Sequence, residues 1–190
     1  MTGVTTGGRP RRRNLLLVVM ALVVSSLAAS ATAVALGSRT DLSSSRRRVD
    51  GAWAKLRPAL TARYRTLGEA AAVTRARLGA ERAVLDEIGG AVAAWPGTAR
   101  SATDRQVAEA GRLEGLAGRL AATVATTPRL RAAPEVTEAL QRLQQTDSAS
   151  ARVAYNAAVL AYQRARGGFP RRLVAGALGY DDRRTLEVPA

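Results

Sequence analysis

The sequence predicts an all-α protein, in which an N-terminal transmembrane helix precedes an antiparallel bundle of three to four long helices. Residues 15–36 contain no charged side chain, and from residue 49 onward apolar residues recur at steps of three and four, the period of one helix face. No stretch of useful length alternates apolar and polar residues as a half-buried strand does. The chain has 190 residues, and the part that follows the uncharged run has the length of one domain.

The uncharged run 15–36 is long enough to cross a membrane. At about 1.5 Å of rise per residue it would form a helix of roughly 33 Å, close to the thickness of a bilayer's hydrocarbon core. We therefore divide the chain into a short basic segment (1–14), a transmembrane signal anchor (15–36), a basic juxtamembrane linker (37–48) and a helical bundle domain (49–190).

Arginines flank the run on both sides and are expected to meet anionic lipid headgroups, at about 1 kcal/mol each near the surface. They are Arg9, Arg11, Arg12 and Arg13 before the run, and Arg39, Arg46, Arg47 and Arg48 after it. The positive-inside rule is nearly balanced between the two sides. The order of basic cluster, Leu-rich core and small residues favours a single-pass protein of the cell membrane, with its bundle on the extracytoplasmic side.

A cleaved signal peptide is the alternative interpretation of the same run. Residues 15–24 have the apolar character of a signal-peptide core, and cleavage sites of the small-x-small type follow at residues 29–31 and 31–33. In that case the protein is an exported helical binding protein that acts free of the membrane. Apolar and small residues continue to Leu36, which favours an uncleaved anchor.

Each predicted helix of the bundle is marked by its apolar stripe and by the residues that end it. A first stripe covers residues 49–67, where Pro58 predicts a kink or an interruption. A second covers residues 78–95 and stops at the Pro-Gly pair that follows. A third helix is expected over residues 103–126.

The remaining sequence predicts one more long helix and a short tail. Pro128 and Pro134 bracket a connector, and the next helix covers residues 135–166, where a Gly-Gly pair ends it. A short amphipathic tail then follows over residues 171–180.

The composition excludes several kinds of active site. The chain has no cysteine and no histidine, so thiolate chemistry, an ordinary zinc site and a Ser-His-Asp arrangement are ruled out. Adjacent carboxylates occur only at Asp86-Glu87 and Asp181-Asp182, and solvated positions are the better interpretation of both. The sequence therefore predicts a protein that is not an enzyme and that binds no cofactor or metal.

The net charge of +14 does not predict nucleic-acid binding. About half of the excess lies within residues 1–48, beside the uncharged run, and the rest is scattered among acidic residues along the helices. A nucleic-acid site needs a clustered basic patch. We expect membrane lipid as a partner, and no nucleic acid.

The most distinctive motif lies near the C-terminus. Its residues are Arg152, Tyr155, Asn156, Val159, Tyr162, Gln163, Phe169, Pro170, Gly179 and Tyr180. Their order resembles the C-terminal signature of the LemA family, which is an Arg followed by Tyr-Asn, a Val, a second Tyr-Asn, a Phe-Pro and a Gly-Phe. The chain departs from this pattern at Gln163 and Tyr180.

The resemblance extends upstream but weakens there. Arg63 matches the first residue of the family's Arg-x-Asp-Leu-x-Pro-Asn-Leu stretch, and the other residues of that stretch are replaced. The chain is thus similar to a divergent LemA family member. The resemblance implies a single-pass membrane protein with a helical domain and a non-catalytic structural, scaffolding or partner-binding role at the cell envelope. Its partner would be another envelope or membrane protein.

The spacing of the signature residues also has a structural interpretation. Tyr155, Val159 and Tyr162 lie at i, i+4 and i+7, so they form one helix stripe that predicts core packing. Contact with a partner is the alternative. Asn156 would then be a buried amide that bonds a neighbouring helix.

The arginines and the Phe-Pro pair of the signature predict further contacts. Arg63 and Arg152 are candidates for ion pairs with Asp147 or Glu69, with plain surface solvation as the alternative. The Phe-Pro pair predicts a hydrophobic plug and a helix start rather than a ligand contact.

Overall fold

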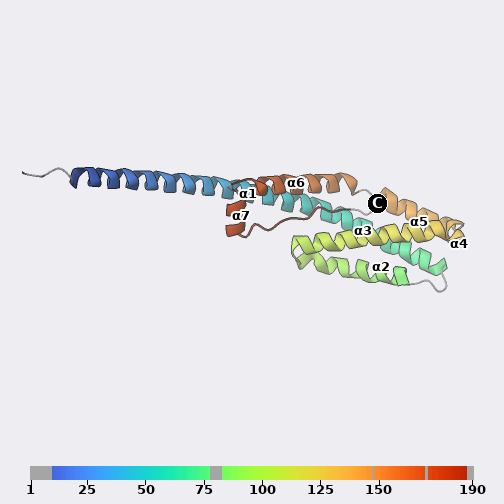
Figure 1. The fold of residues 1–190 in the computed structure, drawn as a ribbon. Helices are drawn as coiled ribbons and strands as arrows, with labels where there is room; N and C mark the ends of the chain where they lie inside the picture. Colours follow the sequence, from blue (N-terminus) through green and yellow to red (C-terminus); the bar gives the residue numbers. More distant parts are fainter. Residues whose placement is uncertain (1–9, 78–82, 147, 170, 188–190) are drawn as a thin grey trace, which may run out of the picture.

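The computed structural model describes residues 10–77, 83–146, 148–169 and 171–187 (Figure 1). Ahead of Arg39 it describes the exposure only of Met20, Leu22 and Gly37. The elements are α1 (Pro10–Arg77), α2 (Ala83–Ala94), the 3₁₀ helix η1 (Trp95–Arg100), α3 (Thr103–Thr126), α4 (Pro128–Arg131), α5 (Pro134–Gln145), α6 (Ala149–Gly167) and α7 (Arg171–Ala177). The described ranges contain helices and no strand, which confirms the all-α prediction.

The predicted transmembrane segment 15–36 lies within α1, but its side chains, apart from Met20 and Leu22, fall outside the described residues. Among the residues that are described, no helix combines the length and the apolar character that crossing a membrane requires.

α1 is one continuous helix of 68 residues, about 100 Å long at 1.5 Å per residue. Residues 37–48, predicted to be a basic juxtamembrane linker, belong to this helix. Leu42 and Val49 are fully buried two turns apart, and the hydroxyl groups of Ser43 and Ser44 donate to backbone carbonyls one turn back along the helix. These serines therefore satisfy their hydroxyls within the helix instead of breaking it.

Pro58 lies inside α1 and does not interrupt it. A proline removes one backbone donor and crowds the preceding turn of a helix. Leu56 and Leu60, on either side, are buried in the core, so tertiary packing holds the helix through the proline. The predicted interruption is wrong.

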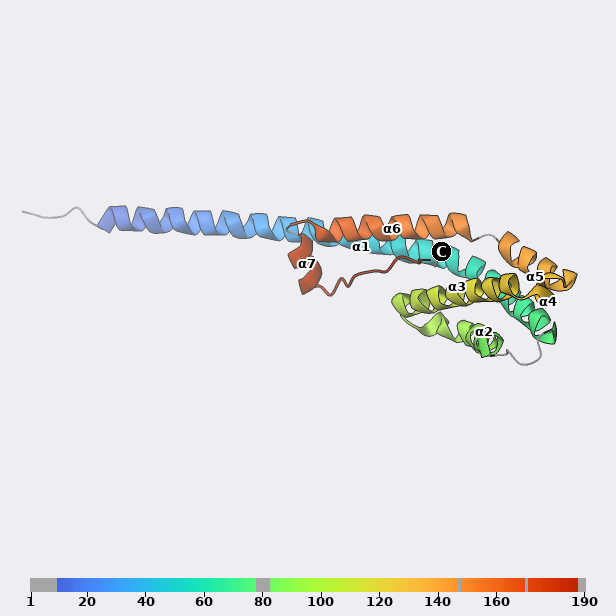
Figure 2. The same cartoon turned by 45° about the vertical axis from the view of Figure 1, so that its right-hand side comes forward.

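The other helices pack around the C-terminal part of α1 (Figures 1 and 2). α6 lies along the middle of α1, α5 contacts it nearer its C-terminal end, and α2 and α3 form an antiparallel pair beside it. Together they enclose one hydrophobic core that extends from Val49 in α1 to Leu186 in the C-terminal tail.

The predicted helix 135–166 is in fact two helices, α5 and α6. Thr146 leaves the helical conformation, with φ −71° and ψ 95°, and its hydroxyl donates to the Arg142 carbonyl at 3.0 Å. Thr, Asp and Ser side chains compete for backbone groups in this way, and these three residues stand in sequence at the break.

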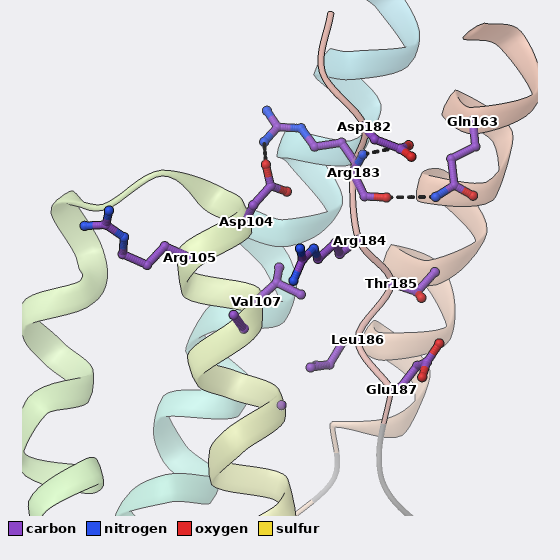
Figure 3. Close-up of a pocket in the computed structure, with 12 residues that line it drawn as sticks. Asp104, Arg105, Val107, Gln163, Asp182, Arg183, Arg184, Thr185, Leu186 and Glu187 are labelled. Carbon is purple, nitrogen blue, oxygen red and sulfur yellow. Dashed lines mark hydrogen bonds and ion pairs between the residues drawn. The ribbon is translucent and has the colours of Figure 1, made fainter. Parts of the chain in front are cut away.

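α7 ends in a left-handed turn at Gly179, whose φ is +66°. The Tyr180 N–H donates to the Ala175 carbonyl at 2.9 Å, the six-to-one bond of a Schellman motif. The predicted amphipathic tail 171–180 is therefore helical only to residue 177. Beyond the turn, residues 181–187 run extended between α6 and α3 (Figure 3).

Candidate functional site

The extended tail 181–187 is held along α6 by side chains of the signature motif. Tyr155, Asn156, Tyr162 and Gln163 each donate a hydrogen bond to a backbone carbonyl of the tail. The acceptors are the carbonyls of Arg184 (2.8 Å), Leu186 (3.1 Å), Asp181 (2.8 Å) and Arg183 (2.8 Å), in the same order. The two adjacent donor pairs lie about two helical turns apart, so one side of α6 presents all four to the tail.

Asn156 binds Leu186 in both directions. Its Nδ2 donates to the Leu186 carbonyl, and its Oδ1 accepts the Leu186 N–H at 2.9 Å. One side-chain amide thus satisfies both backbone groups of a residue outside any helix. The predicted partner of Asn156, a neighbouring helix, is wrong. Since the Leu186 side chain is buried in the core, the tail is an integral part of the domain.

The two signature tyrosines are buried hydrogen-bond donors. Tyr155, Val159 and Tyr162 are all fully buried. Burial, with a smaller contribution from the Asp104 carboxylate and opposed by Arg183, raises the pKa of Tyr155 to about 12. Burial also raises the pKa of Tyr162. Both phenols therefore remain protonated at neutral pH and keep donating to the tail.

Arg183 fixes the other side of the tail. It is buried, and its guanidinium forms ion pairs with Asp104 of α3 at 3.1 Å and with Asp50 of α1 at 3.5 Å. The tail therefore joins α6, through its backbone, to α1 and α3, through this one side chain.

A groove of about 1000 Å³ lies between α3 and the tail (Figure 3). Arg105 and Arg184 line it and are exposed, as is Glu187. Two acidic residues of its lining are already paired, Asp104 with Arg183 and Asp182 with Arg166 at 3.1 Å. Elsewhere too, no group of three or more acidic side chains within the described residues could hold a metal ion.

A second polar cluster lies where α1, α3 and α5 meet. The Arg63 Nε is 2.9 and 3.2 Å from the two carboxylate oxygens of Glu114, whose side chain is 1% exposed. The Arg63 Nη1 donates to the Leu143 carbonyl at 2.8 Å. Arg152 lines a cavity of about 350 Å³ together with Arg63. The cluster caps the last turn of α5 and pairs a buried carboxylate.

Of the two acidic partners predicted for Arg63, the structure tests only Glu69. Glu69 pairs with Arg65 at 4.0 Å instead, and Asp147 lies outside the described residues.

The sequence model of the LemA family matches residues 52–190, which include both α6 and the tail that α6 holds. The chain belongs to the LemA family. No curated protein and no solved structure matches it. The matched region of this LemA family chain begins within α1 and leaves out the uncharged run.

The predictions for the Phe-Pro pair of the LemA signature have different outcomes. Phe169 is 87% exposed, so the predicted hydrophobic plug is wrong. α7 packs through the small residue Ala175 instead, which leaves the bulky side chain that precedes the helix uncovered. Pro170, the predicted helix start, lies outside the described residues, and α7 begins immediately after it.

The predicted lipid-facing arginines differ in exposure. Arg39, Arg47 and Arg48 are exposed. Arg46 is partly buried, with its guanidinium 5.8 Å from the centroid of the Tyr180 ring. The basic residues ahead of the uncharged run, which are Arg9, Arg11, Arg12 and Arg13, have no described side chains.

Sequence reasoning missed three polar residues of the LemA domain core. Glu114 and Gln106 are buried on α3, and Gln106 accepts from the Trp53 Nε1 at 3.0 Å. Gln106 stands seven residues before Leu113, so the helix period places it on the same apolar stripe. A polar residue at such a position could have been identified from the sequence as a buried polar group. Arg183 gave no such signal, since an extended tail has no helical period.

Proposed function

We propose that this LemA family chain is a single-pass membrane protein with a non-catalytic, partner-binding role at the cell envelope. The observation that supports this best is that one uninterrupted helix, α1, contains both the uncharged run 15–36 and the core positions from Val49 to Leu67. A bundle built on the anchoring helix itself stands at a fixed height above the lipid, with no flexible joint between them.

The chemistry of the first half of α1 supports the anchor. The run has no charge and has the length of a bilayer core. The two long apolar side chains described within it, Met20 and Leu22, are 62% and 66% exposed, so the domain does not cover them. Exposed apolar surface of this kind indicates contact with an apolar environment such as a membrane.

A binding role fits the way the polar groups of the domain are used. The ion pairs Arg63–Glu114 and Arg183–Asp104, each with one buried partner, hold helices and tail together. The groove between α3 and the tail, in contrast, presents the exposed Arg105 and Arg184 to the surroundings. Another protein of the envelope, with acidic side chains facing this groove, is the partner that its charge favours.

Membrane fractionation tests the anchor. We expect the full-length chain to stay in the membrane pellet through an alkaline carbonate wash, and the variant Leu17→Arg/Leu22→Arg to move to the supernatant. The matched control is Val153→Arg/Leu160→Arg, which places two arginines at exposed apolar positions of α6 and should stay in the pellet. Intact full-length chain in the supernatant of the unsubstituted protein would refute the anchor.

N-terminal sequencing separates the anchor from its alternative, an exported binding protein. An uncleaved chain keeps its first residues, whereas a mature chain that starts at Thr32 or Val34 has lost its signal peptide. A reporter fused to the C-terminus, read from each side of the membrane, tests whether the bundle is extracytoplasmic as we propose.

A further inference from the structure

α7 is fixed across α1 just beyond the end of the uncharged run. At the start of α7, Arg171 pairs with Asp41 of α1 at 2.7 Å. Past its end, the Arg46 guanidinium lies over the Tyr180 ring. In both views α7 runs across the direction of α1, whereas α6 runs along it (Figures 1 and 2). If α1 crosses a membrane, α7 is therefore aligned with the membrane plane.

Three large apolar side chains, one within α7 and one on either side of it, are not covered by the domain. Phe169 is 87% exposed, Leu173 65% and Leu178 48%. Leu173 stands about 200° round the helix from the buried Ala175, on the face turned away from the domain. Large exposed apolar side chains gathered in one short segment indicate a contact outside this chain.

Exposed arginines lie on the same elements, Arg172 in α7 and Arg39 and Arg47 on the part of α1 near Asp41. Arg39, Arg47 and Arg172 are all exposed, and the nearest acidic residue on α1, Asp41, is already paired with Arg171. Exposed apolar residues together with exposed arginines are the composition of a segment that lies in the interface of an anionic bilayer.

The height of α7 agrees with that position. Asp41 lies about 8 Å further along α1 than Leu36, where the uncharged run ends. The headgroup layer extends several ångströms beyond the hydrocarbon core, and an interfacial helix buries its apolar face about 5–10 Å deep in this region.

We propose that Phe169, α7 and Leu178 form a second membrane contact, which we call the foot, and that the foot binds the headgroup region of an anionic bilayer. This inference rests on the proposed anchor. Together the anchor and the foot would fix both the tilt and the rotation of α1, so that the groove between α3 and the tail always faces the same way along the membrane.

The absence of cysteine allows a direct test with single-cysteine variants of the full chain. Leu22→Cys reports on the anchor, Phe169→Cys and Leu173→Cys on the foot, and Val153→Cys, at an exposed position of α6, on the bundle. Each variant is labelled with an environment-sensitive fluorophore in phosphatidylcholine vesicles, with or without phosphatidylglycerol, that contain a nitroxide lipid as quencher.

With phosphatidylglycerol present, we expect quenching at positions 22, 169 and 173 and none at 153. Without it, quenching should weaken at 169 and 173 and persist at 22, because only the foot depends on anionic headgroups. Quenching at 22 with none at 169 or 173 overturns the foot and leaves the anchor standing, and would point to a protein partner for this face. Loss of quenching at position 22 itself overturns the anchor.

Discussion

Arg63 in α1 and the buried Glu114 in α3 form an ion pair, with the guanidinium Nε 2.9 Å from Oε1, while the same guanidinium donates to the Leu143 carbonyl at the end of α5. One side chain thus connects three helices. The attraction between the two charges is partly offset by the cost of removing them from water. Its larger effect is that neither partner can be removed alone without leaving the other uncompensated.

We therefore expect Arg63→Ala to lower the free energy of unfolding by about 3–5 kcal/mol, because Glu114 would remain buried without a counter-charge. Chemical denaturation followed by circular dichroism measures this. The control is Arg65→Ala: this neighbouring arginine is 79% exposed and its pair with Glu69 spans 4.0 Å, so the change should stay within about 0.5 kcal/mol. Equal effects of the two substitutions would contradict the assignment.

The attachment of the tail gives a second prediction. Asn156→Ala removes both hydrogen bonds to Leu186, and we expect a loss of about 1–3 kcal/mol, since both backbone groups of Leu186 lose their partner. Hydrogen exchange at the Leu186 amide should accelerate more than exchange at core amides of α1. Gln145→Ala, at an exposed position near the end of α5, is the matched control. Unchanged exchange at Leu186 in Asn156→Ala would refute the role of this amide.

The helical part of the fold could be predicted from the sequence because each buried face repeats at the helix period. The third predicted helix, 103–126, coincides with α3. The break near residue 147 was missed because the apolar stripe continues on both sides of it and the signals that end a helix are three small polar residues. The second predicted helix agrees with α2 over residues 83–94, and residues 78–82 lie outside the described ranges.

The candidate site was predicted only in part. The stripe of Tyr155, Val159 and Tyr162 identified buried positions, because burial follows from spacing. The segment that these residues hold could not be identified. Its hydrogen bonds to α6 go through backbone groups of residues 181, 183, 184 and 186, and a backbone group looks the same at every position in a sequence. For the same reason Asp181-Asp182 suggested only a solvated turn, although the Asp181 carbonyl accepts from Tyr162.

Two helix glycines give a third prediction, because their surroundings differ. A Cβ at Gly118 in α3 would meet nothing within 4 Å, whereas a Cβ at Gly68 in α1 would lie 3.3 Å from Val92 Cγ1. Gly118→Ala should raise the free energy of unfolding by roughly 0.5–1 kcal/mol, since alanine loses less backbone entropy in a helix. Gly68→Ala should raise the free energy of unfolding by less than Gly118→Ala does, or lower it.

A double-mutant cycle isolates the cause at Gly68. In a Val92→Ala background the crowding is gone, so Gly68→Ala should be more favourable there than in the original chain. Thermal unfolding of the four proteins supplies the cycle. A coupling of zero would show that α1 and α2 are not in close contact at this point.

The buried phenol of Tyr155 predicts how stability depends on alkaline pH. Its pKa is about 12 in the folded protein, raised by burial, against 10.0 for a solvated tyrosine. The folded state therefore holds this proton more tightly than the unfolded state does, and the resulting stability is fully present below about pH 10 and is lost as the pH rises from there to about 12. Denaturant midpoints should fall across this interval. In Tyr155→Phe, which keeps the buried ring and has no phenolic proton, the fall should be shallower. An identical pH slope in both proteins would contradict the assignment of this group.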